Sequence, residues 1–326
     1  MPFAAARYSG ADVTAPRIIP ADKAGIAEAA ALIVQGQPVG VPSETVYGLA
    51  GDATSGDAVA AIYAAKGRPS FNPLIVHVVD LAMAESIAQF SSIARRLADA
   101  FWPGPLTMVL PQAADAPIAS LVTAGLPTVA VRMPSHPVMR ALIDATGRPL
   151  AAPSANASGA ISATRADHVA RSLDGRIALV LDGGPTEVGI ESTIVAVADN
   201  RLRLLRPGSI TVEMLEAASG LAVDSTDNGT IEAPGQMLSH YAPSKPVRLD
   251  AGNAAPGEFL IGFGTVEGEA NLSPSGALTE AAARLFDILH QADQSEASAI
   301  AIARIPDTGL GLAINDRLKR AAAPRP

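Results

Sequence analysis

A strand, a polar loop and a helix near the N-terminus constrain the fold more than any other segment. Val39-Gly40-Val41 is a short apolar run typical of a β-strand, and residues 56–66 have the pattern of a helix. Between them, residues 42–49 read Pro-Ser-Glu-Thr-Val-Tyr-Gly-Leu, with hydroxyl groups and a carboxylate directly after the strand. Open α/β sheets bind their ligands at the carboxyl ends of strands. We therefore expect an α/β fold whose pocket begins at this segment, which is predicted to be a turn from strand to helix.

The rest of the chain predicts two domains joined by a linker. Alternating strand and helix patterns with one hairpin over residues 17–220 predict a twisted, partly antiparallel mixed sheet with flanking helices. Residues 221–246 are rich in Gly, Pro, Ser and Thr and predict a linker. Residues 247–326 predict a small Rossmann-like α/β domain, and residues 1–16 a flexible leader.

The composition excludes several kinds of site. The chain has no cysteine, which excludes disulfides, thiolate zinc sites, iron–sulfur clusters and cysteine nucleophiles. Its net charge of −8 argues against a surface that coats nucleic acid, although a local basic cleft stays open. No apolar run approaches the roughly 20 residues that cross a bilayer, and the N-terminus lacks the apolar core of a signal peptide. We expect a cytoplasmic protein with no membrane partner.

Basic residues after the first helix indicate an anion site. Lys66 and Arg68 flank Gly67 at the predicted helix end, where basic residues ordinarily offset the helix dipole. Here a loop stiffened by two prolines follows, and it carries Asn72. Triphosphates are bound by such groups, namely the compact ammonium of a lysine and the planar, bidentate guanidinium of an arginine. The loop therefore favours a binding role over a capping role.

Two arginines lie on predicted strands. Alternation places Arg132 on one face with Thr128 and Ala130, a polar wall typical of an anion site. The same alternation places Arg206 on the apolar face of its strand, together with Leu204. A buried arginine needs an anionic partner, and a carboxylate or a bound phosphate would serve equally well.

Other polar residues keep ordinary structural interpretations. His77 fits a hydrogen-bonded core histidine, and Ser154, Asn156 and the segment 189–194 fit plain turns. The chain has no Walker A loop, no Gly-x-Ser-x-Gly elbow and no His-Glu-x-x-His. The residues alone predict an anion- or nucleotide-binding α/β enzyme without naming its reaction or a metal site.

An ordered set of motifs extends this prediction. The matching segments are residues 42–53, 66–78, 101–107, 129–137, 152–159, 189–195, 205–211, 234–243 and 309–317. Together they resemble the YrdC-type threonylcarbamoyl-AMP synthases, in the longer form with an additional C-terminal domain. The resemblance covers nearly the whole chain. Ser43, where many relatives have threonine, keeps the hydroxyl group.

The resemblance implies an ATP-dependent synthesis. L-Threonine, bicarbonate and ATP give threonylcarbamoyl-AMP and pyrophosphate, and other proteins transfer the threonylcarbamoyl group to the adenosine beside the anticodon of certain tRNAs. ATP is thus expected as a substrate, while a need for Mg²⁺ and direct binding of tRNA stay open. The residues implied to hold threonine are Thr45, His77, Arg132, Ala152 (through its backbone) and Ser192. Those implied to hold ATP are Lys66, Arg68, Asn72, Thr128, Ser154, Ser162, Arg206 and Tyr241, of which Lys66 and Arg68 are the catalytic candidates.

The chemistry of these side chains agrees with that reaction. An N-carboxylate formed on threonine would attack the α-phosphorus of ATP, a step that needs positioning and charge stabilisation more than a protein nucleophile. Because the carbamate is labile in water, residues 234–243 are predicted to form a lid, with Tyr241 over the nucleotide. Glu44 and Tyr47 receive no role.

Two other functions stay open. One is a non-catalytic RNA- or tRNA-binding module that uses a basic concave surface. The other is a carbamoyl-AMP-forming carbamoyltransferase, although such proteins usually carry extra domains and zinc-binding cysteines that this chain lacks.

Overall fold

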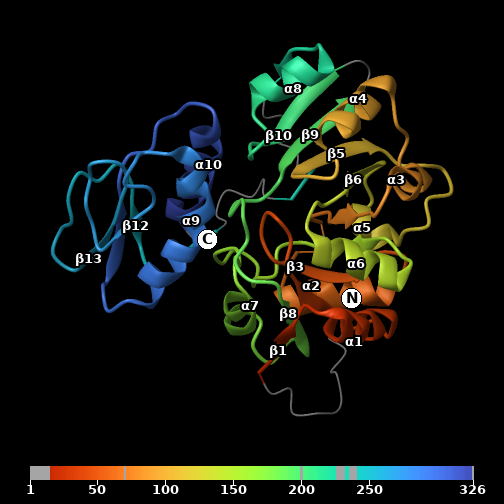
Figure 1. The fold of residues 1–326 in the computed structure, drawn as a ribbon, viewed down its shortest axis with the longest axis horizontal. Helices are drawn as coiled ribbons and strands as arrows, with labels where there is room; N and C mark the ends of the chain where they lie inside the picture. The colour runs from red at the N-terminus through yellow and green to blue at the C-terminus, as the bar shows by residue number, and fades with distance from the viewer. Residues whose placement is uncertain (1–14, 70, 199–200, 225–231, 235–240, 325–326) are drawn as a thin grey trace, which may run out of the picture.

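A large mixed sheet forms the main body of the protein (Figure 1). The computed structural model describes residues 15–69, 71–198, 201–224, 232–234 and 241–324. Within these ranges the strand order of the sheet is β1-β8-β2-β3-β7-β4-β6-β5-β9-β10-β11. The strands are β1 (Arg17–Pro20), β2 (Val39–Val41), β3 (Gly48–Asp52), β4 (Ile75–His77), β5 (Leu106–Pro111), β6 (Thr128–Arg132), β7 (Leu150–Ala151), β8 (Leu179–Asp182), β9 (Thr193–Ala198), β10 (Arg201–Arg206) and β11 (Val223–Asp224). The sheet contains parallel pairs such as β4–β6 and antiparallel pairs such as β5–β6, which confirms the predicted mixed sheet.

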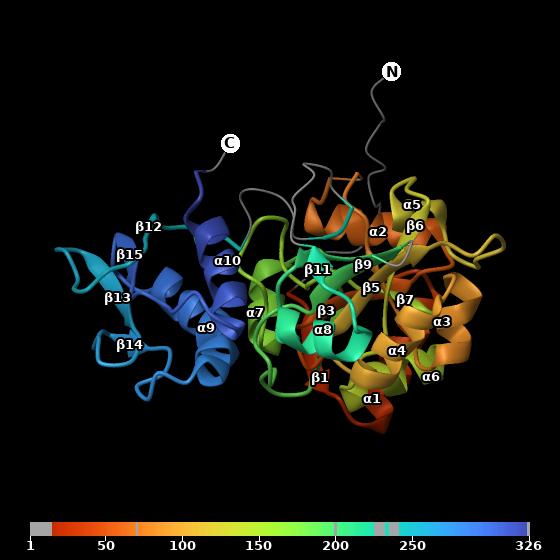
Figure 2. The ribbon, with the colours of Figure 1, turned by 90° about the horizontal axis from the view of Figure 1, so that it is seen from above.

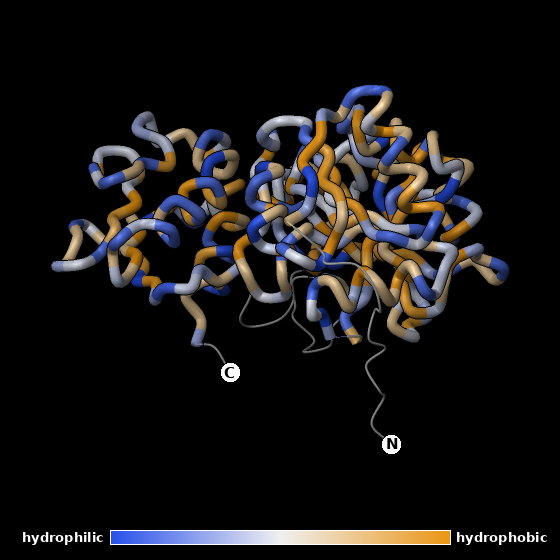
Figure 3. The backbone as a smooth tube through the Cα atoms, turned by 90° about the horizontal axis from the view of Figure 1, so that it is seen from below, coloured by the Kyte–Doolittle hydropathy of each residue, from blue (hydrophilic) through white to orange (hydrophobic). Residues whose placement is uncertain are grey.

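Helices cover both faces of this sheet. Two of them, α1 (Lys23–Val34) and α6 (Pro137–Thr146), pack against β2 and β8 in one core. The opposite face carries the larger core, and Figure 3 shows hydrophobic residues along the central strands. The helices of that core are α2 (Gly56–Lys66), α3 (Leu81–Ile87), α4 (Ser92–Phe101), α5 (Ser120–Thr123), α7 (Ala166–Ser172) and α8 (Val212–Ser219). Side-chain caps such as Ser55, which accepts from the Ala58 N–H, explain where several helices begin.

Strand β3 corrects one prediction. Residues 42–47 connect two antiparallel strands, β2 and β3, so the predicted turn from strand to helix is wrong. The sequence Gly48-Leu49-Ala50-Gly51-Asp52 has two glycines and no β-branched residue, so it lacks a strand pattern. Pairing with β2 and β7 on its two sides produces the strand. At Gly51 a Cβ would lie 2.9 Å from Cδ1 of Ile62, so glycine lets α2 pack closely.

A β-bulge corrects the predicted face of Arg206. Leu204 pairs with Val195, whereas Arg206 pairs with Ile194, so the register shifts between them. Leu204 packs on the large core, but Ile194 belongs to a separate apolar cluster on the other face. Because of the shift, Arg206 lies in a cavity with Ile75 of that second cluster rather than beside Leu204. Its predicted burial is confirmed.

The C-terminal domain has a parallel sheet of its own. Strands β12 (Val247–Arg248), β15 (Ala299–Ile302), β13 (Glu258–Gly262) and β14 (Ala270–Asn271) form it in this order. Helices α9 (Leu278–Gln294) and α10 (Leu310–Ala322) lie between this sheet and the main body (Figure 2). Their apolar side chains share a core with Val46, Ile161, Ile190 and Tyr241. The C-terminal domain is thus a small α/β domain, as predicted, and it docks directly on the main body.

The domain bounds stay predictions. Strand β11 lies in the segment predicted as a linker and pairs with β10 at the edge of the large sheet. Most of the predicted leader and residues 235–240 of the predicted lid lie outside the described residues. Within the described ranges, no helix has the length and apolar character needed to cross a membrane.

Candidate active site

A cavity opens where loop 42–47 meets strands β4 and β6 and the start of β9, with about 530 Å³ of free space when its open mouth is included. The predicted residues that line it are Thr45, Arg68, His77, Arg132, Ala152, Ser154, Ser192, Arg206 and Tyr241. The structure therefore brings together most of the predicted site, from segments nearly 200 residues apart in sequence.

Arg132 is the centre of one end of the cavity. Its Nη1 donates to Oγ1 of Thr45 at 2.9 Å, and its Nε donates to the Gly104 carbonyl at 3.2 Å. Its Nη2 forms an ion pair with Oε1 of Glu44 at 2.6 Å. Ser43 completes the cluster, since its hydroxyl lies 2.9 Å from that of Thr45. N–H groups of both terminal nitrogens of Arg132 therefore stay available for an anionic ligand.

The Arg132 cluster carries nearly balanced charge. Burial would raise the pKa of Glu44, but the Arg132 guanidinium lowers it to about 2, so Glu44 is ionised. Burial, aided by Arg132, lowers the pKa of His77 to about 3, so its imidazole is neutral at neutral pH. Among the residues that the structure describes, none is a hydrogen-bond partner for the buried Nδ1 of His77. Buried polar atoms of this kind usually have a partner, so His77 is available to a ligand.

Ser192 and Ala152 also line the cavity. The Ser192 hydroxyl lies 2.7 Å from that of Thr107 and accepts from Nη2 of Arg206 at 3.1 Å. Ala152 is buried, and its N–H donates to the Ile75 carbonyl. Ser192 therefore connects the Arg132 end of the cavity with Arg206.

Lys66 lies behind the wall of the cavity rather than on it. It is fully buried, and its Nζ donates to the carbonyls of Ser154, at 2.6 Å, and Asn156. Burial lowers its pKa well below the usual value, and Arg68 lowers it further. Neither contact supplies a negative charge, so a nearby anion would favour the ammonium form.

Arg68 and Arg206 are held in the same way. Arg68 donates to the carbonyls of Asn72, at 3.3 Å, and Pro73, at 3.0 Å. Arg206 donates to the Ser192 carbonyl at 2.9 Å. Burial lowers the pKa of Arg68 to about 10, and the Arg206 charge contributes. Among the described residues, none of the three cations Lys66, Arg68 and Arg206 has a carboxylate as a salt-bridge partner.

The remaining predicted residues lie farther from the cavity surface. Asn72 is buried beside Arg68, and Thr128 is half-buried at the other end of β6, four residues before Arg132. Ser162 is buried and donates to Oε1 of Glu191, which itself lines the cavity. Ser162 thus contacts a residue that lines the cavity, whereas Thr128 does not line it.

Tyr241 closes the cavity on the side of the C-terminal domain. Its ring is 1 % exposed and lies 5.6 Å from the Phe286 ring of α9. Its φ of 61° is in the left-handed region, which costs a tyrosine energy and is found mainly at functional sites. Pro234, at the other side of the segment 235–240, accepts from Arg206.

Some residues at the site were not predicted. Glu44 is the partner of Arg132, and a buried arginine on an anion-binding face was the signal that could have found it. Tyr47 has a structural role, because its hydroxyl donates to the Gly184 carbonyl at 2.7 Å. Thr107, Glu191 and Arg317 lie within matched motifs, but their contacts are made across the fold. Within the described part of the chain, no three His, Asp or Glu side chains gather as a metal-binding group.

Comparisons with known proteins cover both domains. A model of the Sua5–YciO–YrdC family, described as telomere recombination, matches residues 31–208, and a model of the threonylcarbamoyl-AMP synthase C-terminal domain matches residues 210–323. The threonylcarbamoyl-AMP synthase of Bacillus subtilis is 45% identical over 324 residues, which cover 92% of this chain and 93% of that protein. The crystal structure of P. abyssi Sua5 complexed with L-threonine has a TM-score of 0.86 at 36% identity and covers 94% of this chain and 97% of that one.

Proposed function

Because the chain belongs to the Sua5-type threonylcarbamoyl-AMP synthases, we propose that its cavity joins L-threonine, bicarbonate and ATP into threonylcarbamoyl-AMP. One observation carries the assignment of sites. The cavity has a nearly neutral end around Arg132 and a cationic end around Lys66, Arg68 and Arg206. The first suits a zwitterionic amino acid, and the second suits a triphosphate.

Threonine binds at the neutral end in this proposal. The free N–H groups of Arg132 clamp its carboxylate, while Glu44 and Thr45 hold the guanidinium in place. Neutral His77 accepts a hydrogen bond through Nδ1 from the amine or hydroxyl group of the substrate. Thr45 and Ser192 supply further hydroxyl contacts, and Ala152 borders the substrate through its backbone. Threonine as a ligand of this cavity is supported by the crystal structure of P. abyssi Sua5 complexed with L-threonine.

ATP binds at the cationic end. The threonine amine adds to CO₂ and loses a proton, or condenses with bicarbonate and releases water, and an oxygen of the resulting N-carboxylate attacks the α-phosphorus. The bond from that phosphorus to the oxygen of the β,γ-diphosphate breaks, and pyrophosphate leaves as an anion with the electron pair of that bond. Lys66, Arg68 and Arg206 stabilise this charge in a buried, preorganised site. Asn72, Ser154, Ser162 and Tyr241 position the nucleotide, and Thr128 lies at the edge of its site.

The product has a use outside this protein. We propose that downstream threonylcarbamoyl-transfer proteins accept it in the cytoplasm and modify the adenosine beside the anticodon of tRNA. Mg²⁺ enters with the phosphates of ATP in this scheme. Direct contact with tRNA is not needed for the reaction.

Pyrophosphate release tests the proposed function. The full chain, with ATP and Mg²⁺, is expected to release pyrophosphate only when both L-threonine and bicarbonate are present, because the N-carboxylate is the nucleophile. Omitting either substrate is the control, and mass spectrometry should detect threonylcarbamoyl-AMP. Equal release without threonine contradicts the proposal. Release driven by carbamoyl phosphate would favour the carbamoyltransferase, and salt-sensitive RNA binding without ATP turnover would favour the RNA-binding module.

A further inference from the structure

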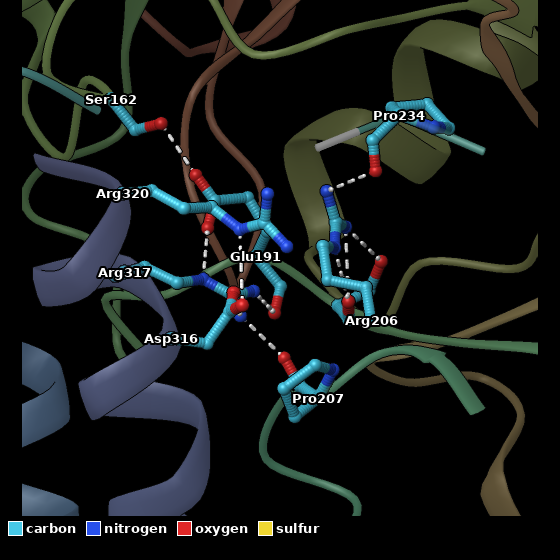
Figure 4. A network of polar contacts seen from close by, with 9 residues as sticks. Ser162, Glu191, Arg206, Pro207, Pro234, Asp316, Arg317 and Arg320 are labelled. Atoms are coloured by element: carbon cyan, nitrogen blue, oxygen red, sulfur yellow. Dashed lines mark hydrogen bonds and ion pairs between the residues drawn. The ribbon is translucent and has the colours of Figure 1, made fainter. Parts of the chain in front are cut away.

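Arg317 of α10 connects the C-terminal domain to the ATP end of the cavity (Figure 4). Its Nε donates to Oε2 of Glu191 at 3.0 Å, and its Nη1 donates to the carbonyl of Pro207. Its guanidinium carbon lies 5.6 Å from the centre of the Tyr241 ring. Three segments of the cavity wall thus meet on one side chain from the other domain.

The environment of Arg317 is unusual for an interdomain contact. The residue is 0 % exposed, although it carries a charge. Asp316 and Glu191 supply negative charge on two sides, at 3.1 Å and 3.0 Å. Burying a guanidinium requires good geometry and satisfied hydrogen bonds, and these are present here. Such a group holds its partners in one arrangement.

Arg317 contacts three residues that belong to the proposed ATP site or lie next to it. Glu191 accepts from the Ser162 hydroxyl with its other oxygen. Pro207 follows Arg206 directly. Tyr241 belongs to the ATP site itself. Arg317 therefore acts on the nucleotide end of the cavity, while the Arg132 cluster makes none of these contacts.

The docking geometry leaves little freedom near this contact. Gly189, two residues before Glu191, has a φ of 76°, and a Cβ there would lie 2.3 Å from the carbonyl oxygen of Ala282 in α9. Nε2 of His290, also in α9, lies 3.1 Å from the Ser162 carbonyl. Helices α9 and α10 therefore both contact the segments that form the ATP end of the cavity.

We propose that Arg317 is a positioning residue for ATP: from the C-terminal domain it fixes Glu191, Pro207 and Tyr241, and through them Ser162 and Arg206. The inference rests on the proposed function of the cavity. It gives the C-terminal domain a definite part in the reaction, because the nucleotide site is complete only when α10 is docked.

The test compares binding of the two substrates by isothermal titration of the full chain. In Arg317→Met the Kd of a non-hydrolysable ATP analogue is expected to rise by roughly tenfold to a hundredfold, the order of loss that a small misplacement of binding groups causes. The Kd of L-threonine, measured without nucleotide, should stay within about twofold. Arg317→Lys keeps the charge but not the planar fork, and an intermediate loss is expected.

Arg165→Met is the matched control. Arg165 also spans the two domains, through an ion pair of 2.7 Å with Asp287, but it is 48% exposed and has no contact with Glu191. Both Kd values should stay within about twofold of wild type in this variant. A tenfold loss of ATP affinity here would show that any break in the interface suffices, and would overturn the specific role of Arg317.

A double variant separates positioning from folding. Arg317→Met leaves Glu191 buried without its partner, so the single variant is expected to melt at a lower temperature. Adding Glu191→Gln removes that unpaired charge and should raise Tm again, while ATP affinity stays weak because the contacts to Pro207 and Tyr241 are still lost. Recovery of ATP affinity together with Tm, an equal loss for threonine and ATP, or unchanged ATP affinity in Arg317→Met each overturns the proposal. Failure of wild type to release pyrophosphate with threonine would instead refute the proposed function.

Discussion

Replacing Arg132 with alanine is expected to lower kcat/KM for L-threonine by on the order of a hundredfold, because charge-assisted hydrogen bonds to a carboxylate contribute about 1.5–3 kcal/mol each. Arg132 lines the cavity, and Thr45 and Glu44 hold its guanidinium in place. The Kd of an ATP analogue should change much less, because the cations of the other end stay in place. Steady-state kinetics with each substrate varied in turn measures both effects.

The stability of the same variant gives an independent check with a definite sign. Without Arg132, burial is the largest influence left on Glu44 and is opposed only by backbone hydrogen bonds, so its folded-state pKa is expected to rise above the unfolded value. Burying Glu44 costs least when its carboxyl group is protonated. The free energy of unfolding of Arg132→Ala should therefore rise as pH falls from 8 toward 5. Leaving the charge unpaired costs about 3–5 kcal/mol at neutral pH. The control Arg132→Ala with Glu44→Gln should lose this pH dependence but stay inactive, whereas wild-type kcat/KM in Arg132→Ala would refute the threonine clamp.

Replacing Lys66 with alanine is expected to lower kcat/KM for ATP by at least about tenfold, equivalent to roughly 1.4 kcal/mol of transition-state stabilisation. Lys66 supplies one of the three buried cations, and it also holds the carbonyls of Ser154 and Asn156. Both losses act on the nucleotide end. Pyrophosphate release at varied ATP, with saturating threonine and bicarbonate, measures the effect.

Arg176 provides the matched control for Lys66. It is an exposed cation whose Nη1 donates at 3.4 Å to the Ala65 carbonyl at the same end of α2, outside the cavity. Arg176→Ala should keep kcat/KM for ATP within about twofold. Equal losses in the two variants would mean that the end of α2, and not the buried ammonium group, sets the rate.

The position of Arg132 was predictable from local sequence. Alternation along residues 128–133 placed it on a polar face typical of an anion site, and in the structure it lines the cavity and contacts Thr45. This prediction of its face succeeded because strand periodicity is a local property. Ser154 and Ser192 also line the cavity, but their local sequence fitted plain turns, and only the resemblance assigned them to the site.

The failures concern features that no local pattern encodes. Strand β3 forms because two neighbouring strands pair with it, although its own residues favour a turn. The face of Arg206 depends on a one-residue bulge, which reverses any alternation that follows it. The contact between Glu191 and Arg317 joins residues 126 apart in sequence, and only docking of the C-terminal domain creates it.

A crystal structure of this protein with L-threonine and a non-hydrolysable ATP analogue tests the central claim most directly. The claim is that one cavity holds both substrates, with amino-acid and nucleotide ends set by the placement of buried charge. The expected result is the threonine carboxylate within hydrogen-bond distance of Arg132, and the phosphates beside Lys66, Arg68 and Arg206. Phosphates on Arg132, or threonine bound outside this cavity, would contradict the account.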